Sequence, residues 1–411
     1  MNRKFLLTIL VLMGIPFFLT IQKITSKAET TSFTNDFLKC ENEQCFSVKN
    51  QTLSSKSIAN NTTIDKPKIE IAILLDSSNS MDGLIEQTRT QIWKVINAIS
   101  DVTKNEEKPI FRVSLYHYGN NSLPSVEGFQ RMLNELTTDL DVVSEKLFSI
   151  QTNGGQEYSG WVIDSATKEL QWSDNPDDFR VIFIAGNEPF DQGSMDWQKA
   201  INSAVKKDIL VNTIYCGLAE NSESDLWVKA ADMGKGNFFN INQDQEFVNI
   251  PSPHDKQITD LNQSLNQTYI PYGNQGNIGY ARQQQQDMNA ISSPNSEAVL
   301  NRAVTKTTSN YRNSNWDLVD AFTDGVTDLK AIDNNSLPEN MRGMTTEEKI
   351  KYIQTMKEER EKISKQIAEL SQKRDDYIRK NLPQSFQENT LDILMIETLK
   401  KQLSAKGFIV K

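Results

Sequence analysis

The oxygen-bearing side chains of Asp76, Ser78 and Ser80 form the most informative chemical pattern in the sequence. They occupy alternate positions of a short polar string that directly follows an apolar run. One carboxylate and two hydroxyls in a tight loop can converge on a single hard cation, because Mg²⁺ and Mn²⁺ prefer oxygen ligands. Capping of the next helix by the two serines is the alternative interpretation. The spacing therefore predicts either a divalent-cation site or a capped helix start.

The elements that must position this motif follow from the hydrophobic pattern around it. Residues 68–75 are typical of a strand buried on both faces, and residues 84–99 are typical of an amphipathic helix. Further strand-like runs lie at 111–118, 180–185, 209–216 and 237–241, and helical patterns lie at 141–149, 160–170, 197–206 and 222–233. This alternation predicts a doubly wound α/β domain with a mostly parallel sheet, in which ligands bind beyond the carboxyl ends of the strands.

The strand, the Asp-x-Ser-x-Ser motif at Asp76, the helix and the alternation together resemble the von Willebrand factor type A domain. The metal-ion-dependent adhesion site of that family begins with this motif. The resemblance covers about residues 68–242. It implies a protein-binding module in which a bound Mg²⁺ or Mn²⁺ keeps an open position for an acidic residue of a protein partner.

Two other parts of the site depart from the family pattern. A threonine usually follows a Gly-Gly pair in the second loop, and Glu157 stands there, which can still bind a metal. The third loop usually supplies an aspartate, and Gly186 stands at that position, with Asn187 and Glu188 as candidate substitutes. The metal ligands implied by the resemblance are Asp76, Ser78, Ser80, Glu157 and Glu188. A fold that keeps the first loop without a working site is the alternative.

The composition excludes several other classes of protein. The 411 residues include 44 Lys+Arg and 54 Asp+Glu, a net charge of −10 at pH 7, so no general positive field attracts nucleic acid. His117 and His254 are the only histidines, which excludes a His-rich metal centre, and His117 is expected to be structural. The lysine-bearing phosphate loop of nucleotide-binding proteins is missing from the sequence, so a nucleotide site is not expected.

The N-terminus predicts export. Positive residues precede an apolar run at 5–21, and a small-x-small cleavage signal ends at Ala28. We expect residues 1–28 to be a signal peptide, with an uncleaved membrane anchor at 5–21 as the alternative. The protein would then lie in a bacterial periplasm or cell envelope, or be secreted. In an oxidising compartment Cys40 and Cys45 could form a disulfide, whereas Cys216 is expected to be a buried thiol.

The remaining chain divides by composition. We expect a polar linker at 29–66, the α/β domain at 67–246, a helical and loop extension at 247–344, and a charged helix with a C-terminal helix at 345–411.

Apolar residues of 345–381 recur at spacings of three and four, as in a coiled coil, although Arg360 and Arg374 fall on the same seam. A helical hairpin closing on 391–403 is expected, and self-association through 345–403 is the alternative. Short sequence segments at 183–190, 269–273 and 316–321 are similar to segments of bacterial exported proteins that combine such a domain with a helical tail. That second resemblance implies no particular activity.

Three functional hypotheses follow, in order of preference. The first is a non-enzymatic exported protein that captures a partner through the metal site at Asp76. The second is a metal-free envelope scaffold that acts through its helical tail. The third is a metal-dependent hydrolase with Glu157 as general base, which ranks last because no positioned nucleophile accompanies the motif.

Overall fold

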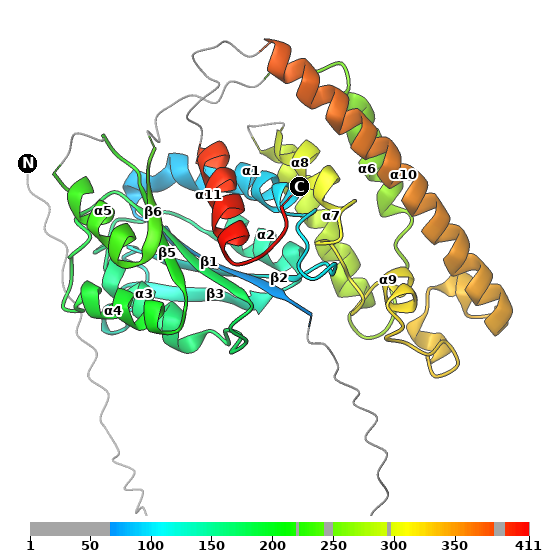
Figure 1. Cartoon of the computed structure of the whole chain (residues 1–411). Coiled ribbons are helices and arrows are strands. Elements are labelled where there is room, and N and C mark those ends of the chain that lie inside the picture. The colour runs from blue at the N-terminus through cyan, green and yellow to red at the C-terminus, as the bar shows by residue number, and fades with distance from the viewer. Residues whose placement is uncertain (1–65, 219–221, 242–249, 294–296, 382–390, 411) are drawn as a thin grey trace, which may run out of the picture. The chain divides into compact units, whose positions relative to one another are not determined.

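A six-stranded sheet forms the centre of the molecule (Figure 1). The computed structural model describes residues 66–218, 222–241, 250–293, 297–381 and 391–410. The strands are β1 (Lys68–Asp76), β2 (Ile110–Tyr118), β3 (Gln130–Thr137), β4 (Phe179–Gly186), β5 (Leu210–Tyr215) and β6 (Lys235–Asn240). Their order in the sheet is β3-β2-β1-β4-β5-β6, and β3 pairs antiparallel to β2 while the other described pairs are parallel. The predicted doubly wound α/β architecture is confirmed.

The carboxyl ends of the central strand β1 and of its two neighbours, β2 and β4, lie at the same edge of the sheet. It pairs in parallel with β2 on one side and β4 on the other, with Asp76 opposite Tyr118 and Leu75 opposite Ala185. Its side chains alternate between two buried layers, so that Ile71 enters one core cluster and Ala72 the other. Burial on both faces explains the continuous apolar run in the sequence, and the register places the loops after β1, β2 and β4 side by side.

Helices cover both faces of the sheet. One face carries α1 (Asp82–Ala98), α2 (Leu140–Ser149) and α11 (Leu391–Ala405), and the other carries α3 (Ser159–Glu169), α4 (Trp197–Lys206) and α5 (Ser224–Met233). The sequence pattern predicted each of these helices, whose starts and ends differ by a few residues.

The sequence pattern missed β3. This strand lies at an edge of the sheet, where it has one neighbour, and six of its eight residues are partly buried or exposed. It therefore lacks the apolar signal of an interior strand.

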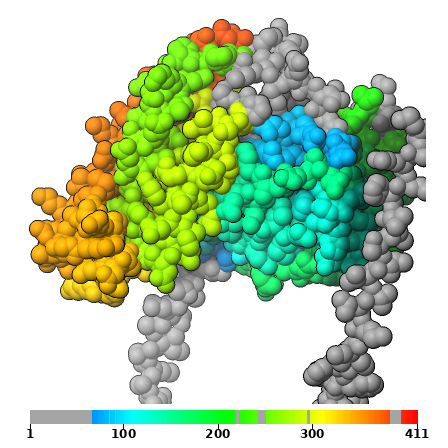
Figure 2. Space-filling view, turned by 180° about the vertical axis from the view of Figure 1, so that it is seen from behind, coloured from blue at the N-terminus to red at the C-terminus, as the bar shows by residue number. Residues whose placement is uncertain are grey.

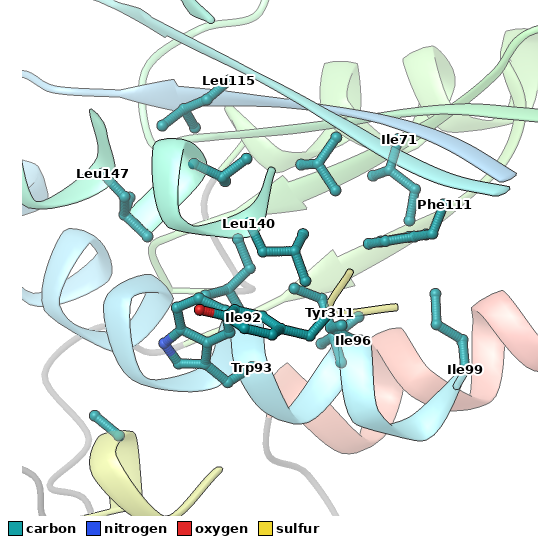
Figure 3. Close-up of a cluster of buried hydrophobic side chains, with 14 of the residues drawn as sticks. Ile71, Ile92, Trp93, Ile96, Ile99, Phe111, Leu115, Leu140, Leu147 and Tyr311 are labelled. Carbon is teal, nitrogen blue, oxygen red and sulfur yellow. The ribbon is translucent and has the colours of Figure 1, made fainter. Parts of the chain in front are cut away.

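The helical extension shares its core with the α/β domain. It comprises α6 (Asp255–Asn266), α7 (Gly276–Ser292), α8 (Glu297–Thr305), α9 (Leu318–Thr323) and α10 (Thr346–Asn381). Helix α8 packs against α1 and α7 packs against α2, and Figure 2 shows the yellow-green extension directly against the blue-to-teal α/β part. Tyr311 of the extension lies among Ile92, Trp93 and Ile96 of α1 (Figure 3). The two parts are therefore one packed body.

The expected hairpin between the last two helices is wrong. Helix α10 packs against α6, α8 and α9, whereas α11 packs against α1 and β6 (Figure 1). On the predicted coiled-coil seam, Ile363 and Ile367 are buried, Arg360 pairs with Asp317, and Arg374 pairs with Asp255. The two arginines thus serve ion pairs within the chain. A coiled coil built on this seam would have to displace the chain's own helices.

Several sequence predictions lie outside the described residues. They are the signal peptide or anchor at 1–28, nearly all of the linker at 29–66, the Cys40–Cys45 disulfide and the domain boundary at 246. In the part of the chain that the structure describes, no helix is both long and apolar enough to cross a membrane. Cys216 is a free, buried thiol, as predicted, and burial raises its pKa well above the usual value.

Candidate functional site

The first loop brings Asp76, Ser78 and Ser80 together at the end of β1. Asp76 is fully buried, and its two carboxylate oxygens accept hydrogen bonds from the Ser78 backbone N–H at 2.7 Å and the Ser78 hydroxyl at 3.1 Å. The hydroxyl oxygens of Ser78 and Ser80 lie 2.9 Å apart. Neither serine side chain caps the helical segments that begin at Asn79 and Asp82. The helix-capping interpretation is therefore wrong, and the three oxygen groups converge.

Glu157 from the second loop completes a pair of buried carboxyl groups. Glu157 is only 4% exposed, its carboxyl group lies within hydrogen-bonding reach of the Asp76 carboxyl group, and among the described residues no N–H or hydroxyl donates to its Oε2 atom. Gly119, after β2, has a φ of +73° and lies against both groups. A Cβ atom there would come within 2.5 Å of Asp76 Oδ1 and 2.8 Å of Glu157 Cγ. A glycine at 119 is thus required for the two carboxyl groups to approach each other.

The two carboxyl groups retain at least one proton between them at neutral pH when no cation is present. Burial raises the pKa of Asp76 to about 6. Burial and the charge of Asp76 raise the pKa of Glu157 to about 10. Two carboxylates this close cannot both ionise in a desolvated site without a compensating positive charge. A divalent cation would supply that charge.

The third loop contributes no carboxylate at the family position, and the packing explains why. A Cβ atom on Gly186 would come within 2.5 Å of the Tyr118 hydroxyl and 2.9 Å of the Trp227 ring. The Tyr118 hydroxyl donates to the Ala185 carbonyl at 3.0 Å, and the Trp227 indole N–H donates to the Glu188 carbonyl at 2.9 Å. These aromatic side chains fill the space that an aspartate would need.

The two candidate substitutes lie at the rim. The Asn187 side-chain oxygen accepts a hydrogen bond from the Ser80 hydroxyl at 3.2 Å. Glu188 is exposed, and its carboxylate accepts from the Gln192 side chain at 3.2 Å. Asn187 is therefore hydrogen-bonded to one of the candidate ligands, Ser80. Glu188 acts on the buried carboxyl pair through its negative charge, which contributes to the raised pKa values of Asp76 and Glu157.

Replacing Gly186 with alanine is expected to destabilise the protein by about 1–3 kcal/mol, because the added methyl group overpacks the aromatic pair. Gly154→Ala is the matched control, since the nearest atom to a Cβ atom there lies 3.5 Å away, an ordinary contact. Urea denaturation of both variants measures the difference. Equal midpoints for the two variants would show that the third loop has room for a side chain.

Sequence reasoning missed the residues that join the loops. The Asn120 side chain donates to the Ser77 carbonyl at 3.1 Å and to the Gln151 carbonyl at 2.9 Å. The Ser77 hydroxyl lies 3.0 Å from His117 Nδ1, and burial lowers the pKa of His117 to about 4. The histidine is thus a buried structural group. The available sequence signal was the pair Gly119 and Asn120 directly after a strand, because these residue types favour tight turns.

The residues present fit a divalent cation. Two carboxyl groups and two hydroxyls form a hard-oxygen donor set, and both carboxyl groups are buried side by side. No group of three or more His, Cys, Asp or Glu side chains within the described ranges is placed to hold a metal ion. On the chemistry of their oxygen atoms, Asp76, Ser78, Ser80 and Glu157 would be the protein ligands, with water completing the coordination of a Mg²⁺-like ion.

Comparisons with known proteins agree with the architecture. The family model of the von Willebrand factor type A domain matches residues 70–253. A search of curated proteins finds no match to the chain.

Among solved structures, the SpRpn10 VWA domain is 18% identical, with a TM-score of 0.34, and the alignment covers 44% of this chain and 90% of that one. A von Willebrand factor type A protein from Catenulispora acidiphila is 16% identical (TM-score 0.33), with 43% and 39% covered. Proximal thread matrix protein 1 from the mussel byssus, with a zinc-occupied MIDAS motif, is 12% identical (TM-score 0.33), with 44% and 43% covered. This chain thus spans less than half the length of the last two proteins.

Proposed function

Since residues 70–253 match the family model of the von Willebrand factor type A domain, we propose that this protein is an exported, non-enzymatic binding protein that captures a protein partner through a divalent cation. The cation would be held by Asp76, Ser78, Ser80 and Glu157. When bound, Mg²⁺ or Mn²⁺ supplies an open coordination position for an oxygen ligand, which an acidic residue of the partner would occupy.

The observation that carries this proposal is the buried pair of carboxyl groups, Asp76 and Glu157, beside the Ser78 and Ser80 hydroxyls. Without a cation this pair retains a proton, because two carboxylates this close cannot both ionise in a desolvated site. A cation held by Asp76 and Glu157 would replace that proton and compensate both negative charges. The Ser78 and Ser80 hydroxyls would add two further ligands.

Binding, rather than catalysis, is the activity that these residues support best. Ser77 and His117 form a hydroxyl–imidazole pair at 3.0 Å, but Ser77 is fully buried and no substrate could reach it. Export is part of the proposal on the strength of the apolar run at 5–21 and the cleavage signal at Ala28.

Calorimetric titration of the purified protein with Mg²⁺ and Mn²⁺ tests the proposal. We expect saturable binding that disappears in Asp76→Ala, because that change removes the buried ligand on which Ser78 is oriented. Asp191→Asn is the control, since Asp191 is an exposed acid on a neighbouring loop. Absence of saturable binding by the unmodified protein, or binding that survives in Asp76→Ala, would contradict the proposed metal site.

A further inference from the structure

We infer that the partner captured at the carboxyl edge of the sheet presents a positively charged protein surface, so that any acidic residue reaching the cation sits among lysine or arginine side chains. The inference rests on the proposed function, because the cation site marks this edge as the binding face. It specifies the chemistry of the partner, which the metal ligands alone leave open.

The topology gathers loops at this edge, and five of them surround the site or lie next to it; the loop after β6, described only at 241 and 250–254, is not counted among them. Parallel strands end on the same side of a sheet, and the helices that follow them begin there. The described loop segments are 77–82 after β1, 119–129 after β2, 150–158 before α3, 187–196 after β4, and 216–218 with 222–223 after β5.

These described segments contain no lysine, arginine or histidine, and the basic residues directly beside them are Arg131 at the start of β3 and Lys199 in the first turn of α4. Besides the largely buried Glu157, they carry Asp82, Glu127, Glu188, Asp191, Asp196 and Glu223. All of these six are exposed except Glu223, which is half-buried. A surface that carries mainly one sign of charge attracts partners of the opposite sign and repels others.

Helix stabilisation explains only part of this acidity. Asp82 lies in the first turn of α1, and Asp196 caps α4 by accepting from the Lys199 backbone N–H at 3.1 Å. Acids at helix N-termini are common, because they offset the positive end of the helix dipole. Glu188 and Asp191 lie in no helix, and Glu127 lies in a single 3-10 turn at Ser125–Glu127, so none of the three is placed at the N-terminus of an α-helix.

The opposite edge of the sheet differs. There Lys68 pairs with Asp178, Lys104 with Asp177, and Arg180 with Asp208. Acids at that edge are thus matched by cations. At the carboxyl edge, Asp196 pairs with Lys199 of α4 at 3.1 Å, and the described loop segments themselves contribute acids without a basic residue.

A bound divalent cation would not reverse the charge of the carboxyl edge. Its two positive charges equal the two negative charges of Asp76 and Glu157, so the buried centre becomes neutral. The exposed acids around it remain. A lone carboxylate on an otherwise neutral or acidic partner would meet their repulsion, whereas a basic surface around that carboxylate would be attracted.

Fluorescence anisotropy of labelled oligolysine and oligoglutamate peptides, titrated with the full-length protein at low ionic strength in EDTA, tests this inference. We expect oligolysine to bind and oligoglutamate not to bind. The variant Glu127→Lys/Asp191→Lys should bind oligolysine about tenfold more weakly, because it reverses two exposed charges that are not metal ligands. Binding should also weaken as salt shortens the reach of the charges.

The matched control reverses two exposed acids on α10, in the variant Glu358→Lys/Glu359→Lys. Both double variants change the net charge from −10 to −10 + 4 = −6. Less than about a twofold effect is expected in the control, since α10 is not at the carboxyl edge. Equal weakening in the two variants, undiminished binding in the loop variant, or preferential binding of oligoglutamate would each overturn the inference.

Metal uptake is measured separately, by calorimetric titration with Mg²⁺. Loop-dependent oligolysine binding without Mg²⁺ uptake would refute the proposed metal function and leave the charge assignment in place. Mg²⁺ uptake without loop-dependent oligolysine binding would refute the charge assignment alone.

Discussion

Replacing Arg302 with alanine is expected to lower the free energy of unfolding by about 3–5 kcal/mol, because the buried Asp141 carboxylate loses its cation and the buried Asp287 carboxylate keeps only Lys306. The Arg302 guanidinium lies 2.7 Å from Asp141 in α2 and 2.6 Å from Asp287 in α7. It is fully buried and lies over the Trp93 ring at 5.0 Å. The side chain therefore joins the helical extension to the α/β domain, and its loss affects both.

Chemical denaturation followed by tryptophan fluorescence measures this effect. The control is Lys256→Ala, which breaks an ion pair with Asp260 whose side chains are 85% and 58% exposed. That change should cost less than about 1 kcal/mol, because water already solvates both charges. Similar losses in Arg302→Ala and Lys256→Ala would contradict the role of Arg302 as a buried link.

Low pH should also weaken the ion pairs that Arg302 makes between the helical extension and the α/β domain. Although burial opposes it, the positive charges of Lys306 and Arg302 hold the pKa of Asp287 well below its usual value. A carboxylate with a lowered pKa stabilises the fold above its unfolded pKa of about 4, and that contribution is lost as the pH falls further.

Asp76→Asn is expected to abolish divalent-cation binding and yet to stabilise the metal-free protein at pH 8 by about 1–3 kcal/mol. In the metal-free protein, burial raises the pKa of Asp76 to about 6, and burial with the Asp76 charge raises that of Glu157 to about 10. Between the unfolded pKa values near 4 and these folded pKa values, the folded protein binds more protons than the unfolded chain. The contribution of the Asp76–Glu157 pair to the free energy of unfolding therefore falls as the pH rises through this range.

Thermal unfolding in EDTA at pH 5 and pH 8 measures this change. The gain in melting temperature of Asp76→Asn should be larger at pH 8 than at pH 5, because the unmodified protein must bury an ionised carboxylate at pH 8. The side-chain oxygen of the introduced asparagine can still accept the hydrogen bond from the Ser78 backbone N–H. Asp191→Asn, a change at an exposed acid, should alter neither melting temperature. A lower melting temperature for Asp76→Asn than for the unmodified protein at pH 8 in EDTA would show that the carboxylate is a structural group.

The sequence by itself determined the α/β architecture and the first site loop. The run at 68–75 is buried on both faces, so its apolar pattern is continuous, and Asp76 had to lie at its carboxyl end. The Asp-x-Ser-x-Ser spacing needs only one tight loop to converge. Both signals are local, because one strand and one turn contain them.

The tertiary structure alone decided the remaining features. Glu157 meets Asp76 because Gly119, on a third segment, leaves room for both, and Gly186 has no side chain because Tyr118 and Trp227 fill the space. The two final helices separate because other helices and ion pairs offer each a better surface than its neighbour in sequence. These outcomes depend on packing between segments far apart in the chain, and hydrophobic periodicity along one segment carries no information about its partners.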